Sequence, residues 1–231
     1  MSNTDDLSAE AMHSGKRHPM PFVRMELAVL SIVDERLSVL LGRRAQAPHA
    51  GHWALPGGVL RIDLDEDLEA AAQRVASERL GSALPFLRQL SAVGGRSRDP
   101  RAPWALSVVY RALLPVESLE LLPGKRLEQL AWRPADEAAA DPGLAFDHAA
   151  LVGDAVAATR REIDGLDLPF GFLPAQFTLG ELQACCEAIL GHRLDKSSFR
   201  RRLDDRDLLD PVPGAMRTGA FRPAQLYRRK G

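Results

Sequence analysis

The residues between Trp53 and Gly81 have the side-chain types and spacings in this sequence that best suit phosphate chemistry. The stretch WALPGGVLRIDLDEDLEAAAQRVASERLG contains a Gly-Gly pair followed by Glu66, Arg74 and Glu78. Carboxylates bind hard divalent cations such as Mg²⁺, which in turn hold phosphate oxygens. Glu78 lies four residues after Arg74, so on a helix the two side chains are expected to pair with each other. That pairing would take Glu78 away from a metal ion.

Arginines flank the same stretch, and guanidinium groups hold a diphosphate without metal through paired hydrogen bonds. The loop Arg98-Asp99-Pro100-Arg101 adds a carboxylate that suits ribose hydroxyls. Trp53 is a candidate for stacking on a base, although a Trp beside Leu55 is also typical of a core. Each arginine taken singly also suits a solvated surface. The predicted ligand site consists of Arg43, Arg44, Trp53, Gly57, Gly58, Arg61, Glu78, Arg79, Asp99 and Arg101.

The stretch resembles the Nudix box, whose pattern is Gly, five residues, Glu, seven residues, then Arg-Glu-apolar-x-Glu-Glu-x-Gly. The positions that match are Glu66, Arg74, Glu78 and Gly81, preceded by Trp53, Leu55, Pro56, Gly57 and Gly58. The resemblance implies a Nudix-like α/β/α sandwich built on a mixed sheet.

Three departures from the Nudix pattern bear on activity. Val75 and Arg79 stand where the family has metal-binding glutamates, and seven residues instead of five separate Gly58 from Glu66. Family members hydrolyse diphosphates with a divalent cation held by these carboxylates. We therefore expect nucleotide binding without catalytic residues, a metal site or a required cofactor. The alternative is a Mg²⁺-dependent hydrolase of nucleoside diphosphate derivatives with an accessory domain.

A basic helix is predicted near the C-terminus. With Phe199 and Leu203 facing inward, a rotation of about 100° per residue directs Ser197, Ser198 and Arg201 outward. Short polar and arginine side chains contact base edges, and flanking cations contact phosphates. The alternative is a solvated helix on an adaptor that binds an acidic protein. The predicted DNA-binding residues are Lys196, Ser197, Ser198, Arg200, Arg201, Arg202, Arg217 and Arg222.

The charge distribution favours an anionic partner for this end of the chain. The whole sequence has a formal net charge of −1, whereas Phe172–Gly231 has 11 Lys and Arg against 7 Asp and Glu. Hydrophobic residues make up 45% and charged residues 26% of the 231, which is typical of a globular protein. No apolar run approaches the length of a membrane span. The adjacent Cys185 and Cys186 fit two buried thiols in a reducing cytoplasm.

Hydrophobic periodicity and cap residues predict the elements that position these groups. Strands are expected at Leu27–Val33, Leu37–Leu41, Leu87–Val93, Ala105–Leu114 and Gln129–Arg133, with a turn at Asp34-Glu35 between the first two. Helices are expected from the cap at Asp65–Asp67 to Leu80, at Pro134–Ala140 and at Asp147–Ile163. A helix capped by Thr178 and Glu181, a second helix at Asp195–Asp207 and a hairpin complete the chain in winged-helix order.

The expected fold class is α+β. We predict a disordered tail at 1–20, a Nudix-like ligand-binding domain at 21–164, a linker at 165–174 and a winged-helix DNA-binding domain at 175–231. The linker and the helix before it are the expected hinge.

Over about residues 24–230 the chain resembles the Nudix-related transcriptional regulators of the NrtR type. The segments that carry this resemblance are LPGGVLRIDLDEDLEAAAQRV, RDPR, AFDHAALV and the C-terminal FTLGELQACCEAILGHRLDKSSFRRRL. The resemblance implies a homodimer that binds operator DNA, responds to ADP-ribose or a related nucleotide or sugar, and represses genes of NAD metabolism. The hypothesis is thus a cytoplasmic, ligand-responsive regulator.

Overall fold

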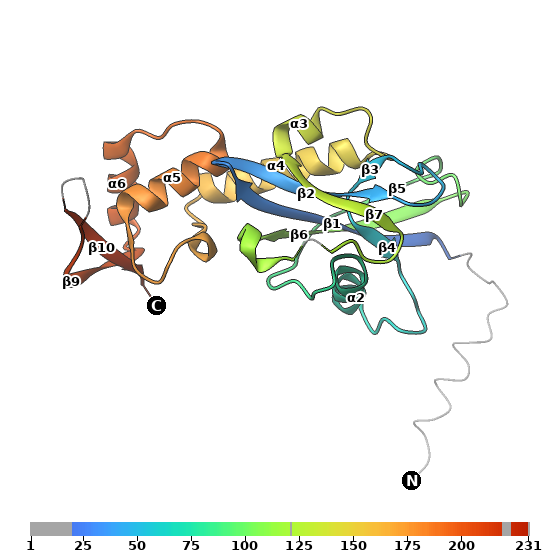
Figure 1. Ribbon diagram of the computed structural model, residues 1–231, viewed down its shortest axis with the longest axis horizontal. Helices are drawn as coiled ribbons and strands as arrows, with labels where there is room; N and C mark the ends of the chain where they lie inside the picture. The colour runs from blue at the N-terminus through green and yellow to red at the C-terminus, as the bar shows by residue number, and fades with distance from the viewer. Residues whose placement is uncertain (1–19, 121, 219–222, 231) are drawn as a thin grey trace, which may run out of the picture.

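The computed structural model describes residues 20–120, 122–218 and 223–230. The tail predicted at 1–20 lies outside these ranges except for the exposed Met20. A larger domain built on a mixed sheet is joined to a small domain of two helices and a hairpin (Figure 1). In the described part of the chain, no helix is both long and apolar enough to cross a membrane.

The larger domain is organised around a seven-stranded sheet with the order β3-β2-β1-β6-β5, in which β4 also pairs with β1 and β7 with β2. Among the described strands of this sheet, only β1 and β6 pair in parallel, and Leu27 lies opposite Tyr110 in their register. The strands are β1 (Phe22–Val33), β2 (Arg36–Arg44), β3 (Trp53–Ala54), β4 (Gly57–Val59), β5 (Arg88–Gly95), β6 (Ala105–Leu113) and β7 (Leu127–Pro134).

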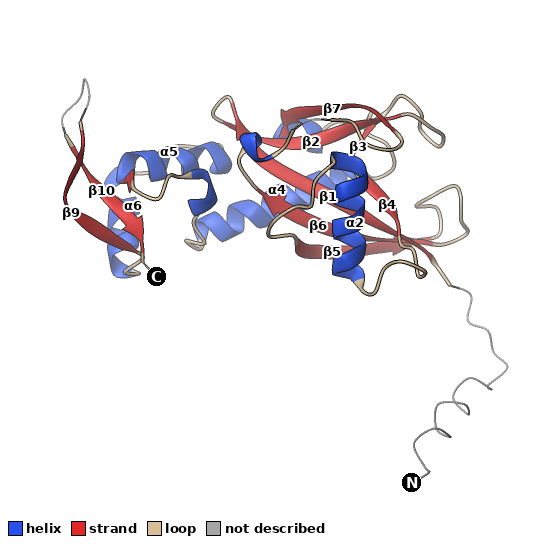
Figure 2. Ribbon diagram, turned by 60° about the horizontal axis from the view of Figure 1, so that its bottom comes forward, coloured by secondary structure: helices blue, strands red, loops and turns tan. Residues whose placement is uncertain are grey.

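Helices cover both faces of this sheet (Figure 2). Alternate residues of β1 belong to different cores: Met25, Leu27 and Val29 pack with α2, whereas Ala28 and Leu30 pack on the side of α4. The helices are α2 (Leu68–Leu80) on one face and α3 (Ala135–Ala139) and α4 (His148–Asp164) on the other, with a short 3-10 helix η1 (Val116–Ser118) before β7. The predicted α/β/α sandwich with a mixed sheet is confirmed.

Local signals account for the limits of α2. The Asp67 side chain accepts a hydrogen bond from the backbone of Ala70 at the start, and Gly81 adopts the left-handed conformation, φ 73°, at the end. The predicted turn at Asp34-Glu35 also takes positive φ values, 48° and 60°, which suit the twist of a tight hairpin.

The small domain has the predicted order of a winged helix. Thr178 and Glu181 form the expected capping box at the start of α5, and the helix ends at Gly191. Asp195 caps α6, whose Phe199 and Leu203 are buried. The elements are β8 (Phe177–Thr178), α5 (Leu179–Leu190), α6 (Lys196–Asp205), β9 (Leu209–Arg217) and β10 (Ala224–Arg229), and the sheet order is β8-β10-β9.

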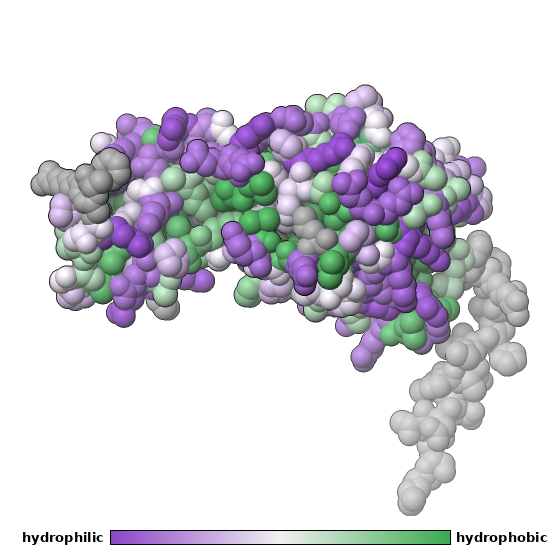
Figure 3. All heavy atoms as spheres, in the orientation of Figure 1, coloured by the Kyte–Doolittle hydropathy of each residue, from purple (hydrophilic) through white to green (hydrophobic). Residues whose placement is uncertain are grey.

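The segment predicted as a linker packs against both domains. It contains a short 3-10 helix, η2 (Phe170–Phe172), and Leu168 is buried in the apolar cluster around α4. The same cluster extends into the core of the small domain through Leu182 and Phe199. Apolar side chains also gather on the surface where the two domains meet (Figure 3). Because this segment contains leucines and phenylalanines among its glycines and prolines, its burial is favourable.

Candidate ligand cavity and DNA-binding helix

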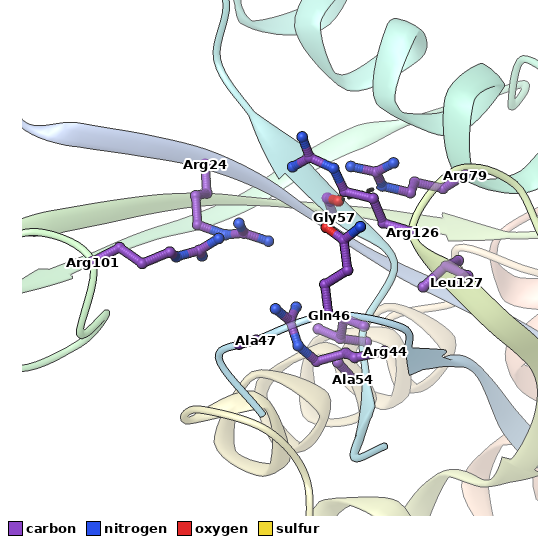
Figure 4. A pocket seen from close by; sticks show the side chains of 11 residues that line it. Arg24, Arg44, Gln46, Ala47, Ala54, Gly57, Arg79, Arg101, Arg126 and Leu127 are labelled. Atoms are coloured by element: carbon purple, nitrogen blue, oxygen red, sulfur yellow. Dashed lines mark hydrogen bonds between the residues drawn. The ribbon is translucent and has the colours of Figure 1, made fainter. Parts of the chain in front are cut away.

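A cavity of about 50 Å³ in the larger domain is lined by five arginines and by no carboxylate residue from the described part of the chain. The arginines come from separate parts of the chain and converge from several sides, as Figure 4 shows. The lining residues are Arg24, Arg44, Gln46, Ala47, Ala54, Leu55, Gly57, Arg79, Arg101, Arg126 and Leu127. Such a lining suits an anion.

Two of these arginines are held by buried carboxylates behind the cavity wall. Arg24 Nε lies 2.7 Å from Glu26 Oε1, and Arg101 Nε lies 2.8 Å from Asp99 Oδ1. Burial of Glu26 disfavours its charged form, but the Arg24 guanidinium together with His148 and Arg98 outweighs this effect and lowers the pKa of Glu26 below its ordinary value. Burial likewise opposes ionisation of Asp99, yet its hydrogen bonds from Arg101 lower the pKa of that carboxyl. Both carboxylates are therefore charged and fix their arginines.

The other three, Arg44, Arg79 and Arg126, form no ion pair with any residue that the structure describes. Arg44 Nε donates to the carbonyl of Pro48 at 2.8 Å. Burial lowers the pKa of Arg44, and the neighbouring cations Arg24 and Arg101 lower it further. Burial also lowers the pKa of Arg79. Positive charge thus exceeds negative charge at this cavity, and an anionic ligand would relieve the repulsion.

The ring of Phe146 lies within reach of three of the cavity arginines. The guanidinium carbons of Arg44, Arg24 and Arg101 lie 5.0, 5.9 and 5.9 Å from the ring centroid, within cation–π range. Phe146 is separated from the first residue of α4 by Asp147 alone. His148, the first residue of α4, accepts a hydrogen bond at its Nδ1 from the backbone amide of Leu55, 2.9 Å away. Leu55 in turn lines the cavity. The N-terminal end of α4 is therefore part of the cavity's support.

A larger groove of about 890 Å³ lies between α5 and the tip of the β1–β2 hairpin. Its lining includes Glu35, Glu117, Asp136, Glu181 and Glu187 as well as three arginines. Because carboxylates repel phosphate, the smaller arginine cavity is the better candidate for a nucleotide diphosphate.

Four of the ten predicted ligand residues line the cavity: Arg44, Gly57, Arg79 and Arg101. Asp99 acts indirectly, by holding Arg101. The other five predicted residues contact groups outside the cavity. Arg43 donates a hydrogen bond to the carbonyl of Gly51, the Arg133 guanidinium lies over the ring of Trp53, and Gly58 packs on Val75. Arg61 forms an ion pair with Asp63, and Glu78 forms one with Arg74.

Three polar cavity residues, Arg24, Gln46 and Arg126, were not predicted from the sequence. The one local signal for Arg24 is that Arg24 and Glu26 are the charged residues of a mostly apolar strand. No pattern within the turn Gly124-Lys125-Arg126 indicates that it reaches a site next to α2.

The helix that resembles the Nudix box does not fit a divalent cation. Val75 is fully buried and its Cγ2 would lie 2.7 Å from a Cβ at position 58, so it packs directly on Gly58. Arg79 places a cation at the cavity wall, and Glu78 Oε1 lies 3.4 Å from Arg74 Nη1. Within the described residues, no group of three potential metal ligands comes together.

The surface of α6 separates into an apolar and a basic side. Phe199 and Leu203 are 3% and 2% exposed, whereas Lys196, Arg200 and Arg201 are exposed. Ser197 is exposed and Ser198 is half-buried. Ser197 and Arg201 thus face outward as the helix rotation predicts, whereas Ser198 is less exposed than predicted.

The other predicted DNA-binding arginines differ in environment. Arg202 donates a hydrogen bond to the backbone carbonyl of Asp164 at the end of α4, which holds it against the larger domain. Arg217 on β9 lies 3.2 Å from Glu181 of α5. Arg222 lies outside the described residues.

Comparisons with known proteins cover both domains. The NUDIX domain profile matches residues 24–154, and the profile of the NrtR DNA-binding winged helix domain matches residues 169–229. The chain is 34% identical over 218 residues to the ADPR responsive transcriptional repressor NtrR of Acinetobacter baylyi, covering 94% of this chain and 86% of the relative.

Two solved structures of Shewanella oneidensis NrtR are also similar. The complex with a 27mer DNA is 34% identical, with a TM-score of 0.73 over 90% of this chain and 93% of that chain. The NUDIX domain complexed with ADP ribose is 29% identical, with a TM-score of 0.58 over 67% of this chain and 98% of that chain. The chain, with its arginine cavity and basic α6, therefore belongs to the NrtR family of transcriptional regulators, in which a NUDIX domain precedes an NrtR winged helix domain.

Proposed function

We propose that this protein is a transcriptional repressor that binds operator DNA through its winged helix and responds to ADP-ribose or a closely related nucleotide. The observation that carries the proposal is the combination of a carboxylate-free arginine cavity in one domain with an exposed basic helix in the other. The Acinetobacter relative is an ADPR responsive repressor, and Shewanella NrtR binds DNA and, through its NUDIX domain, ADP ribose. This function places the protein in the cytoplasm.

The DNA contact is proposed to come from α6 of each subunit of a homodimer. One chain has a single helix of this kind among its described residues, and a two-fold pair would contact two half-sites of an operator. Ser197 and Arg201 are directed toward base edges, and Lys196 and Arg200 toward phosphates.

The two sites are connected through α4. Its first residue, His148, and the nearby Phe146 contact residues that line the cavity. Its last residue, Asp164, accepts the hydrogen bond from Arg202 of α6. A ligand that changes the position of the cavity arginines would act on one end of a rigid helix whose other end contacts the DNA-binding domain. The closely packed segment 165–174 supports transmission by a shift of packed elements instead of a flexible hinge.

Hydrolysis is not part of the proposed function. Val75 and Arg79 replace two carboxylates that a cation would need, and Glu78 is paired with Arg74. Incubation with ADP-ribose and Mg²⁺ or Mn²⁺ is expected to leave the nucleotide intact. Turnover that Glu78→Gln abolishes would show instead that the helix retains catalysis.

A mobility-shift titration on DNA upstream of the protein's own operon tests the regulator function. Binding is expected without ADP-ribose and is expected to weaken when ADP-ribose is added. Arg201→Ala is expected to weaken binding by about tenfold or more, whereas Arg61→Ala, which removes an exposed arginine far from α6, is expected to leave it unchanged. Arg201→Ala without effect would favour an adaptor that binds an acidic protein.

A further inference from the structure

Arg79 is a buried arginine whose guanidinium is fixed by backbone carbonyls instead of a carboxylate. Its side chain is among the buried charged groups, at 7% exposure. Nε donates to the carbonyl of Gly57 at 2.7 Å, and Nη1 donates to the carbonyl of Lys125 at 2.6 Å. Nη2 has no hydrogen-bond acceptor among the described residues, while the residue itself lines the cavity. At least one donor group of the Arg79 guanidinium is therefore without an acceptor among the described residues.

Arg126 reaches the same wall of the cavity through a turn built on the end of α2. The amides of Gly124 and Lys125 donate to the carbonyls of Arg79 and Glu78 at 3.0 Å each, which satisfies the C-terminal end of the helix. A Cβ at Gly124 would lie 2.2 Å from the Glu78 carbonyl oxygen, so only glycine permits this approach. Arg126 then takes a left-handed backbone conformation, φ 65°, and its exposed side chain enters the cavity.

The end of α2 and this turn thus form one unit that presents two arginines side by side, opposite Arg44 (Figure 4). Arg126 is among the cations that oppose the charge of Arg79. Neither has a carboxylate partner among the described residues. The charge of Glu78 favours that of Arg79, but Glu78 itself pairs with Arg74. Two like charges without an ion pair of their own favour binding of an anion between or beside them.

We propose that Arg79 and Arg126 form a clamp that binds the diphosphate of the ligand directly, in place of a divalent cation. This proposal rests on the proposed function and specifies its chemistry: the ligand class is a diphosphate, and binding needs no metal. Paired donors of a guanidinium match phosphate oxygens, and a fixed guanidinium costs little further ordering on binding. A cation at this wall would instead be repelled by both arginines.

The test is isothermal titration of the full-length protein with ADP-ribose and with inorganic pyrophosphate, in EDTA and in MgCl₂. The wild type is expected to bind both probes in EDTA, and MgCl₂ is expected not to strengthen the binding of either. Arg126→Gln is expected to weaken both by about tenfold or more, because a hydrogen bond to a charged group is lost. The matched control is Arg61→Gln, which removes an exposed arginine of the neighbouring loop outside the cavity.

Arg79→Glu replaces the fixed cation by a carboxylate and is expected to bind ADP-ribose only when Mg²⁺ is added. If this variant does not fold, Arg126→Gln and Arg126→Glu carry the test, since Arg126 is exposed and makes no hydrogen bond through its side chain to a described residue. Loss of wild-type binding in EDTA, or equal binding by Arg126→Gln and Arg61→Gln, would overturn the clamp. If the wild type binds pyrophosphate without metal but does not bind ADP-ribose, the clamp is supported and the proposed effector is contradicted.

Discussion

Arg160 of α4 donates a hydrogen bond from Nε to the backbone carbonyl of Ile189, 3.0 Å away, at the end of α5. The same guanidinium binds both carboxylate oxygens of Asp136 on α3 at 2.8 Å. The Arg160 side chain thus connects the larger domain to α5, the first helix of the small DNA-binding domain. The contact satisfies a carbonyl that the helix itself leaves unpaired.

Replacement of Arg160 by alanine is expected to lower the free energy of unfolding by about 1–2 kcal/mol, through loss of the Ile189 hydrogen bond and a partly exposed ion pair. Urea denaturation measures this change. Arg36→Ala is the control, because the pair of Arg36 with Glu137 is more than half exposed on both sides. We expect that variant to lie within about 0.5 kcal/mol of the wild type. An equal loss in the two variants would contradict the role of Arg160 at the domain junction.

His148 is expected to make folding stability depend on pH between about 6.5 and 4. Burial lowers the pKa of His148 to about 4, from an ordinary value of 6.5. Below pH 6.5 the unfolded chain therefore takes up a proton that the folded protein does not, so stability is full above this pH and falls as the pH decreases. Between pH 7 and pH 5 this single group costs about 2 kcal/mol.

Comparison with His148→Gln isolates this contribution, because glutamine keeps a side-chain acceptor for the Leu55 amide and does not titrate. Urea denaturation at pH 7 and pH 5 is expected to show a smaller loss for the variant. The pKa of Glu26 is also lowered, but its ordinary value of 4.5 places most of its effect below pH 5, the lower of the two pH values compared. Equal losses in both proteins would show that His148 is protonated in the folded state.

Arg201 and Arg202 are adjacent but are expected to affect DNA binding differently. Arg201 is exposed, whereas Arg202 is bound to the Asp164 carbonyl. Arg201→Ala is expected to cost about 1–3 kcal/mol of operator binding. Arg202→Ala is expected to leave the salt dependence of binding unchanged and to lower thermal stability. Fluorescence anisotropy over a range of salt concentrations checks both, and a smaller salt slope for Arg202→Ala would indicate that Arg202 moves to a phosphate in the complex.

Val75→Glu, which restores one residue of the Nudix pattern, is expected to destabilise the fold by about 3 kcal/mol or more. The position has no exposed surface and packs on Gly58, so the new carboxylate would lose its hydration without a partner. Ser77→Glu, two residues later on the exposed side of α2, serves as the control and is expected to change stability by about 0.5 kcal/mol or less. A stable Val75→Glu protein would mean that the helix has room for a metal ligand after all.

The sequence alone determined the elements whose signals are local. The caps at Asp67 and Thr178, the terminal glycines Gly81 and Gly191, and the turn at Asp34-Glu35 act over a few residues, and the structure places helices and a hairpin accordingly. The apolar positions of α6 follow in the same way from helix rotation. The family was also evident from motifs that are contiguous in the chain.

Only the tertiary structure decided which arginines meet. Arg24 and Arg126 are remote in sequence and reach one cavity because β1 lies at the centre of the sheet and the turn before β7 caps α2. Arg202 has the same sequence pattern as its neighbours, but the end of α4 lies beside it. Side-chain type limits which partners a residue accepts, whereas long-range packing determines which partners come within hydrogen-bond distance.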